Sequence, residues 1–293
     1  MFTATEFKRI HREFKEVQLK RRLKLQKVWG TLLVITILIL VLFIVLFPNQ
    51  FQNPTTAWIL PTYGGMVFLI VLIGFLVSNK FLSEKPFFDD LFPQVYNKIN
   101  ITEGMAFDYK AYDNEDKEFN KMGGLFTRFA SVKIKRHVEG KTEEQHRFNI
   151  YDCKMTTSNG KNQQTHFDGI YFILEKNVNT SLQVRTNGSP KLKGIKFDKQ
   201  PEFDEIRVYK ETEQTMRSVD NQFVRFVSDL ARNPEYKRVY LSIVEGQIHL
   251  ALWYKNHPAR KQKIMTVETL NNLYIFFLNE YKLLSDIDNV DVF

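Results

Sequence analysis

Three side chains have the types and spacing that chemistry would need: His166, Asp168 and Cys153. One residue separates His166 from Asp168 in a stretch that alternates like a strand, so both side chains are expected on one face. An imidazole beside a carboxylate can act as an acid/base pair or as metal ligands. Because the polar faces of strands commonly carry such pairs, an ordinary surface pair is the favoured interpretation.

Cys153 is the single cysteine of the chain, which excludes an internal disulfide and fits a reducing compartment. Two interpretations are open for it. It is either a catalytic thiol or a small residue packed within the strand that we expect over residues 148–155. The packed residue is the favoured one.

No motif for a metal or a cofactor accompanies these residues. The six histidines include no pair with the His-x-x-x-His spacing, and the chain has no Cys-x-x-Cys, no glycine-rich phosphate loop and no Gly-x-Ser-x-Gly. We therefore expect no metal and no cofactor, and an enzyme is the less favoured class.

The residues that could do chemistry lie in a strand-rich region that begins near Gly104. Two helices with apolar stripes are expected near its end, one capped by Ser218 and one by Thr266. Runs of strands followed by helices favour an α+β fold with a largely antiparallel sheet. Residues 80–293 are assigned to it, as one domain or two, with a further helix over 87–99. The strands are expected over residues 105–112, 129–138, 148–155, 167–174, 181–185 and 206–210.

The clearest local structure is a hairpin over Val239–Tyr254. Glu245-Gly246 is a two-residue turn, which fixes the register so that Val244 lies opposite Gln247. His249 then falls on the polar face of the hairpin, where we expect an ordinary surface histidine.

Three segments of this region resemble the bacterial domain of unknown function 3137 family. They are His166-Phe167-Asp168-Gly169-Ile170-Tyr171-Phe172, Glu202-Phe203 leading into Val208-Tyr209, and the hairpin Val239–Ala251 with its glycine turn at Gly246. The resemblance implies a membrane protein with a β-rich domain. Since that family has no assigned activity, the resemblance implies no catalytic residues.

Two runs without charged side chains precede this region, Trp29–Phe47 and Ala57–Ser78, with Pro48–Thr56 between them. As helices of nineteen and twenty-two residues they would be about 28 and 33 Å long, close to the thickness of a hydrocarbon core. The sequence predicts a transmembrane hairpin over residues 29–79, with spans 29–47 and 57–78 and the loop 48–56. Gly64, Gly65 and Gly74 are places where the two helices could approach closely, although their spacing is not Gly-x-x-x-Gly. Aromatic anchors at the membrane interface are expected at Trp29, Trp58 and Tyr63.

Residues 1–28 are expected to form a basic helix before the hairpin. They hold nine basic and three acidic side chains, so they carry +6 of the net charge of +8. The nearly neutral remainder argues against a nucleic-acid-binding domain. Lys/Arg counts place both termini in the cytoplasm, in a multi-pass protein of the cell membrane. The side chains expected to contact anionic headgroups of the inner leaflet are Lys20, Arg21, Arg22, Lys24 and Lys27.

The leading hypothesis from these features is a binding or scaffolding module at the inner face of the membrane. Its expected partners are the lipid bilayer and a membrane or cytosolic protein. Two alternatives stay open. One is a membrane-tethered enzyme of unfamiliar type that uses His166, Asp168 or Cys153, and the other is an accessory subunit of a transport or secretion complex.

Overall fold

The computed structural model describes residues 1–46, 65–74, 87–110, 119, 123–126, 131–159, 162–178, 181–190, 192, 194–200, 206–212, 220–260 and 266–292. The chain divides into two compact units, a helical unit of Phe2–Asp90 and a sheet unit that contains Leu91–Phe293. The helical unit holds α1 (Ala4–Leu46) and a helix over 65–74. The other elements are α3 (Phe87–Glu103), β1 (Asp108–Lys110), β2 (Ser131–Lys141), β3 (Arg147–Asn159), β4 (Asn162–Glu175), β5 (Leu182–Arg185), β6 (Phe197–Lys199), β7 (Arg207–Glu211), α4 (Asn221–Arg232), β8 (Tyr236–Val244), β9 (Gln247–Tyr254), the 3-10 turn η3 (Pro258–Arg260) and α5 (Val267–Asn289).

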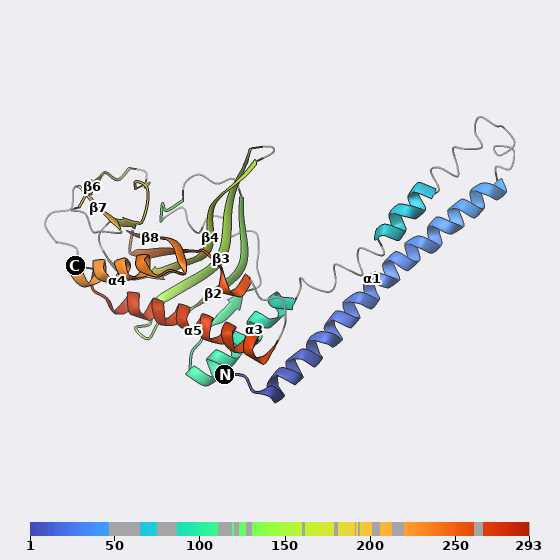
Figure 1. Ribbon diagram of the computed structural model, residues 1–293, viewed down its shortest axis with the longest axis horizontal. Helices are drawn as coiled ribbons and strands as arrows, with labels where there is room; N and C mark the ends of the chain where they lie inside the picture. Colours follow the sequence, from blue (N-terminus) through green and yellow to red (C-terminus); the bar gives the residue numbers. More distant parts are fainter. Residues whose placement is uncertain are drawn as a thin grey trace. The chain divides into compact units, whose positions relative to one another are not determined.

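Helix α1 is one continuous helix of 43 residues that begins at a capping box. The hydroxyl of Thr3 accepts a hydrogen bond from the Glu6 backbone N–H at 3.2 Å, and the Glu6 carboxylate accepts one from the Thr3 N–H at 2.8 Å. These two bonds satisfy N–H groups that a helix start leaves without partners. The basic segment 1–28 and the apolar run that follows it are therefore parts of a single rod (Figure 1).

The predicted transmembrane hairpin over residues 29–79 is wrong. Within the ranges that the structure describes, no helix combines the length and the apolar character needed to cross a bilayer. The described helix at 65–74 has ten residues, about 15 Å, which is half of a hydrocarbon core. The first apolar run continues a strongly charged helix, whereas the prediction treated it as a separate span. The multi-pass location with both termini in the cytoplasm falls with the hairpin. The loop 48–56 lies outside the described residues.

Within the helical unit, the ring of Trp29 lies against Gly74. A Cβ atom placed on Gly74 would come within 2.5 Å of the Trp29 ring, whereas one on Gly65 would meet nothing within 4 Å. Gly74 thus permits the close approach that the sequence suggested for it, and Gly65 does not take part.

The sheet unit is the expected α+β domain. Its nine strands form one antiparallel sheet in the order β1-β2-β3-β4-β9-β8-β5-β7-β6. Helices α3, α4 and α5 lie along one face (Figure 1). We call this the helix-covered face, and the other the opposite face. On the helix-covered face, register aligns a buried apolar row across seven strands: Val138, Ile150, Phe172, Leu250, Leu241, Val184 and Val208.

The predicted hairpin is confirmed residue by residue. Val244 pairs with Gln247, and the turn residues Glu245 and Gly246 have φ of 49° and 77°. Positive φ at both central positions defines the turn whose twist matches that of the flanking strands.

Of the two predicted N-caps of the late helices, the one at Thr266 is confirmed and the one at Ser218 is not. Thr266 caps α5, where its hydroxyl accepts from the Thr269 N–H at 3.1 Å. Helix α4 begins instead at Asp220, whose carboxylate accepts from the Gln222 N–H. Ser218 lies outside the described residues.

A β-bulge in β2 turns one arginine toward the helices. Ile134 pairs with Cys153 and Arg136 with Asp152, so Lys135 is an extra residue. Because side chains alternate along a strand, the extra residue places Ile134 and Arg136 on different faces. Simple alternation would have put both on the same face. The bulge thus delivers a charged side chain to the helix-covered face.

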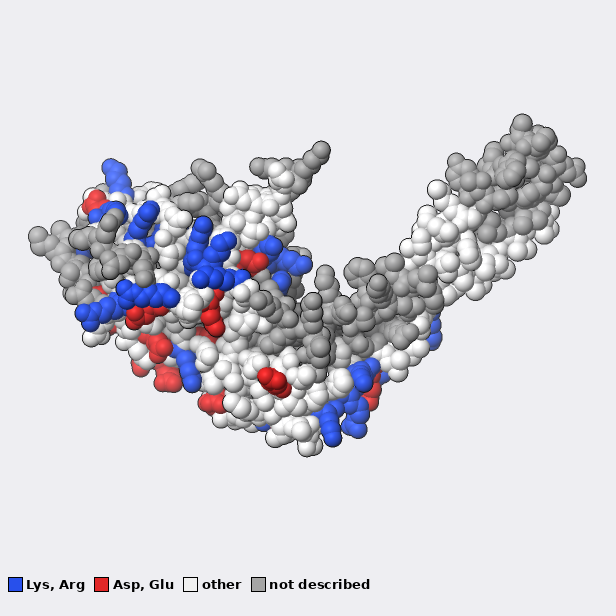
Figure 2. All heavy atoms as spheres, in the orientation of Figure 1, with Lys and Arg blue, Asp and Glu red and all other residues white. Residues whose placement is uncertain are grey.

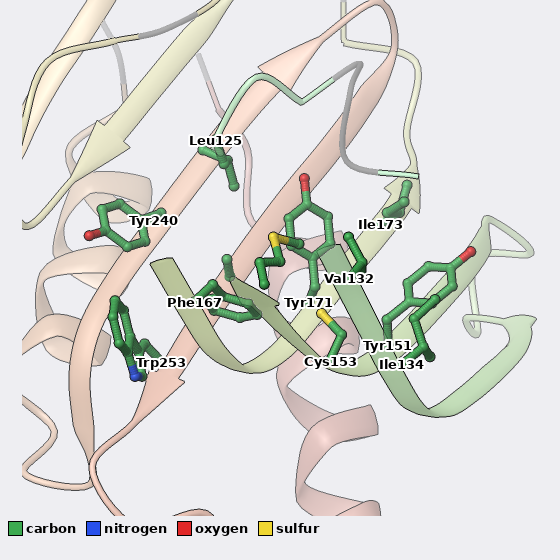
Figure 3. Packing of buried hydrophobic residues seen from close by; sticks show 12 residues of the cluster. Leu125, Val132, Ile134, Tyr151, Cys153, Phe167, Tyr171, Ile173, Tyr240 and Trp253 are labelled. Atoms are coloured by element: carbon green, nitrogen blue, oxygen red, sulfur yellow. The ribbon is translucent and has the colours of Figure 1, made fainter. Parts of the chain in front are cut away.

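The opposite face carries its own core of aromatic and aliphatic side chains (Figure 3). Phe119 and Phe126 pack against it from a segment that precedes β2. Gly169 of β4 lies so close to β9 that a Cβ atom would be 2.0 Å from the Leu252 carbonyl oxygen. The buried members of this opposite-face core are Leu125, Val132, Ile134, Tyr151, Cys153, Met155, Phe167, Tyr171, Ile173, Tyr240, Ala251 and Trp253.

Candidate functional site

The largest exposed apolar surface described is on the helical unit. Leu38 is 61% exposed and Val45 67%. Between Leu32 and Val45 the exposed positions spread over roughly 220° of the helix circumference at 100° per residue. A packed helix of a globular domain hides an apolar stripe, so this pattern is unusual. The exposed large apolar side chains are Val17, Leu19, Leu23, Leu25, Val28, Leu32, Val34, Ile35, Ile37, Leu38, Ile39, Val41, Leu42 and Val45 on α1, and Met66, Val67, Phe68, Leu69, Ile70, Leu72 and Ile73 on the second helix.

Basic side chains occupy the other part of α1. Lys20, Lys24 and Lys27 are exposed, and Figure 2 shows that the charged residues of the helical unit gather toward one end. The side chains of Arg21 and Arg22, and the whole of Trp58 and Tyr63, lie outside what the structure describes. Trp29 is half-buried against Gly74.

The sheet unit holds two buried polar networks, and the first lies on the helix-covered face. Arg136 is fully buried and forms two hydrogen bonds of 2.6 Å to the carboxylate of Glu280 on α5. It also donates to the hydroxyl of Tyr96 on α3 and lies 4.4 Å from the centroid of the Phe277 ring. Burial raises the pKa of Glu280, and the Arg136 charge opposes that rise. This network joins α3 and α5 to β2.

His257 and Asp152 extend the first network. Both are buried, and His257 Nε2 lies 3.2 Å from Asp152 Oδ2 without hydrogen-bonding geometry. Burial lowers the pKa of His257 to about 4, although the Asp152 charge acts in the other direction. An imidazole beside a carboxylate is chemically capable, but α5 and η3 pack over this side of the sheet.

The second network lies on the opposite face, in two neighbouring register rows. Tyr171, Ala251, Tyr240, Arg185 and Arg207 are successive neighbours across five strands in one row. His249, Ser242, Gln183 and Tyr209 are neighbours in the next. His249, Ser242 and Gln183 have no exposed surface.

Main-chain groups of residues 123–125 cover this second network. Gln183 Nε2 donates to the Gly123 carbonyl at 3.4 Å and to the Ser242 hydroxyl at 3.3 Å. Gly123 lies against the His249 ring and the Tyr171 hydroxyl, where a Cβ atom would come within 2.8 Å of both. His249 is therefore not the surface residue that the hairpin pattern predicted. The covering segment lies more than a hundred residues away in sequence, so no local pattern could reveal it.

The two buried arginines differ in their partners. Arg136 faces a carboxylate, whereas Arg185 contacts only neutral groups among the described residues. Its Nε donates to the Gln183 side-chain oxygen at 3.0 Å, and its Nη2 donates to the carbonyls of Gly124 at 3.3 Å and Leu125 at 3.1 Å. It also lies over the Tyr240 ring, 5.4 Å from the centroid. Burial lowers the pKa of Arg185.

The three residues selected from sequence for chemistry have separate surroundings. His166 is the extra residue of a β-bulge in β4, and its Nε2 lies 2.7 Å from the Thr157 hydroxyl. Asp168 lies opposite Lys154, with 3.8 Å between Oδ2 and Nζ. Cys153 is a fully buried member of the opposite-face core. Sequence reasoning missed Arg185, Gln183, Arg136 and Glu280, for which no motif exists.

Comparison with known proteins adds little. No family model matches the chain, and no curated protein matches it. Among solved structures, the crystal structure of the mycobacterial trehalose monomycolate transport factor A is similar at 14% identity and a TM-score of 0.36, over 63% of this chain and 93% of that one. A likeness this low carries no argument about function.

Proposed function

We propose that the protein is a binding protein that contacts lipid surfaces through its helical unit. The apolar side chains of α1 would meet acyl chains, and Lys20, Lys24 and Lys27 would meet anionic headgroups. The proposal concerns contact with lipid and not a crossing of the bilayer. The exposed apolar surface between Leu32 and Val45 carries it.

Exposure of this surface to water is costly. Burial of one Leu or Ile side chain contributes about 1.5–3 kcal/mol, and contiguous apolar patches beyond a few hundred Å² mark interaction sites. A partner helix would cover one stripe, whereas the exposed side chains extend around more than half of α1. Lipid can cover such a surface from several sides. Each lysine near an anionic surface adds on the order of 1 kcal/mol.

Flotation with vesicles tests this proposal. We expect the full chain to float with neutral phosphatidylcholine vesicles, and more completely when phosphatidylglycerol is added. Substitution of Lys20, Lys24 and Lys27 with Gln should reduce only the preference for anionic vesicles. Leu38→Ser with Leu42→Ser should reduce flotation with both. Ile275→Ser is the matched control, because Ile275 is an exposed apolar residue of α5, and it should change nothing.

Two results would overturn lipid contact. One is a chain that stays with the buffer fraction for both vesicle types. The other is an oligomer that hides the α1 surface and ignores vesicles, which would assign this surface to self-association.

The sheet unit is proposed to bind a protein partner, as expected from the sequence. Cys153 is enclosed in the opposite-face core, so a substrate cannot reach its thiol, and the enzyme alternative has no nucleophile there. Membership of the domain of unknown function 3137 family stays a prediction. The close approach of Gly169 to β9 gives a physical reason for the glycine in the segment that carries the resemblance.

A further inference from the structure

Arg185 is a buried cation with no acid beside it in the part of the chain that the structure describes. It is 3% exposed. Its acceptors are two main-chain carbonyls and one amide oxygen, all neutral. Buried charges in proteins are normally paired or bind a ligand, because removal of an ion from water costs several kcal/mol.

The same sheet shows what a paired arginine looks like. Arg136 is as deeply buried as Arg185, and the Glu280 carboxylate binds it through two bonds of 2.6 Å. This parallel geometry uses Nη1 and Nη2 of the guanidinium, whereas Nε has no hydrogen-bond partner among the described residues. The fold can therefore supply an acid to a buried arginine, and among the described residues it supplies none to Arg185.

Arg185 also has donors left over. Nε and Nη2 make the three hydrogen bonds described above, which leaves the two N–H groups of Nη1 without an acceptor in the described ranges. An ordered anion could take both of these donors. Gln183 holds the other side of the guanidinium in place, since its side-chain oxygen accepts from Nε at 3.0 Å.

A second orphan group lies under the same covering segment. His249 has no exposed surface, and its Nε2 has no hydrogen-bond partner among the described residues. Its Nδ1 lies 3.2 Å from the Tyr171 hydroxyl, and Gly123 lies against its ring. His249 Nε2 is thus a buried polar atom without a partner among the described residues, and it lies on the same sheet face as the guanidinium of Arg185, which has no acid beside it. Together they indicate an interior built around something polar.

We propose that Arg185 is the anchor of a binding site for a small anion that bears a carboxylate or a phosphate group, on the sheet face opposite the helices. Arg185 Nη1 supplies the charge-assisted hydrogen bonds, Gln183 orients the guanidinium, and His249 Nε2 offers a further polar contact. Planar and tetrahedral oxyanions are the ligands that a guanidinium binds best.

Thermal unfolding of the full chain tests the site with three salts at matched ionic strength: sodium phosphate, sodium acetate and sodium chloride. At 10 mM, an anion present at ten times its Kd should raise Tm by about 3 °C over chloride. A rise with phosphate alone assigns a phosphate-bearing ligand, and a rise with acetate assigns a carboxylate. No rise over chloride with either would overturn the proposal.

Three variants locate the response. Arg185→Gln should lose it. Arg225→Gln is the matched control, because Arg225 is an exposed arginine of α4 outside the second network, and it should keep the response. Gln183→Glu is the decisive variant, since it places a carboxylate at the position of an oxygen 3.0 Å from Arg185 Nε.

Gln183→Glu should abolish the anion response, because an internal acid takes the place of the ligand. It also removes the amide donor to the Gly123 carbonyl, so its Tm without added anion does not enter the test. This variant decides the question even if Arg185→Gln fails to fold. A full response to phosphate or acetate in Gln183→Glu would place the anion elsewhere and refute the site.

Discussion

Single side chains in the sheet unit show how little space the fold leaves. Gly169 is the clearest case, because β4 and β9 approach there until a Cβ atom would overlap the Leu252 carbonyl. The obstacle is the main chain of β9 at Leu252 and Trp253, so no change of side-chain rotamer relieves the overlap.

Gly169→Ala should therefore lower the free energy of unfolding of the sheet unit by more than about 3 kcal/mol, measured by urea denaturation. Gly30→Ala is the control, since a Cβ atom on Gly30 meets nothing within 4 Å. It should be neutral, or stabilise α1 by up to about 1 kcal/mol through helix propensity. Equal stability of Gly169→Ala and the wild type would show that the two strands can separate.

The buried pair of Arg136 and Glu280 gives a second prediction at this scale. Glu280→Gln should cost about 3–5 kcal/mol in unfolding free energy, because it leaves Arg136 charged and buried without its acid. The double variant Arg136→Leu with Glu280→Leu should cost less than Glu280→Gln alone, since neither charge is then stranded. A double variant that is less stable than the single one would contradict the desolvation argument.

At the scale of elements, different contacts position side chains in the sheet unit and in the helical unit. Strand pairing, three bulges or register shifts among the described strands, and a positive-φ turn position side chains in the sheet unit. In the helical unit, the Trp29 ring of α1 packs on Gly74 of the helix over 65–74. The Trp29–Gly74 contact is thus a sensitive point for that pair of helices.

Gly74→Ala should displace the Trp29 ring, because its new Cβ atom would lie 2.5 Å from that ring. In a background in which Trp58 and Trp253 are replaced by Phe, the fluorescence of Trp29 should shift to longer wavelength as water reaches the indole. Gly65→Ala is the matched control and should leave the spectrum unchanged. An unshifted spectrum in Gly74→Ala would mean that the ring does not rest on residue 74.

At the scale of the whole molecule, two buried histidines make stability depend on pH. Burial lowers the pKa of His249 and of His257 to about 4, against an ordinary value of 6.5. Both are neutral in the folded protein at pH 7. As pH falls from 6.5 toward 4, the unfolded chain gains protons that the folded chain cannot bind, so stability falls.

Between pH 7 and pH 5 each histidine should remove about 2 kcal/mol of unfolding free energy, measured by urea denaturation at the two values. His249→Gln and His257→Gln should each remove about half of this dependence, whatever they do to stability at pH 7. If the loss between pH 7 and pH 5 persisted unchanged in both variants, groups other than these imidazoles would be responsible.

Features that depend on neighbours along the chain were predictable from the residues alone. The hairpin over Val239–Tyr254 was predicted in the correct register because its two-residue turn leaves one pairing, and Thr266 was predicted as a cap because capping is local. The antiparallel α+β class followed from the order of strands and helices.

Features that depend on distant segments become visible in the folded chain and in no local pattern. The extra residue at Lys135 becomes visible only in the pairing with β3, and it sends Arg136 to Glu280, 144 residues away. His249 and Arg185 are buried by main chain from residues 123–125. The predicted spans failed for a related reason. Hydropathy counts residues in a run, whereas in the structure the first run continues a strongly charged helix and the described helix at 65–74 has ten residues. Periodicity predicts which face of the sheet a residue occupies. Whether that residue is buried, and which groups it bonds to, depends on the segment that packs over that face.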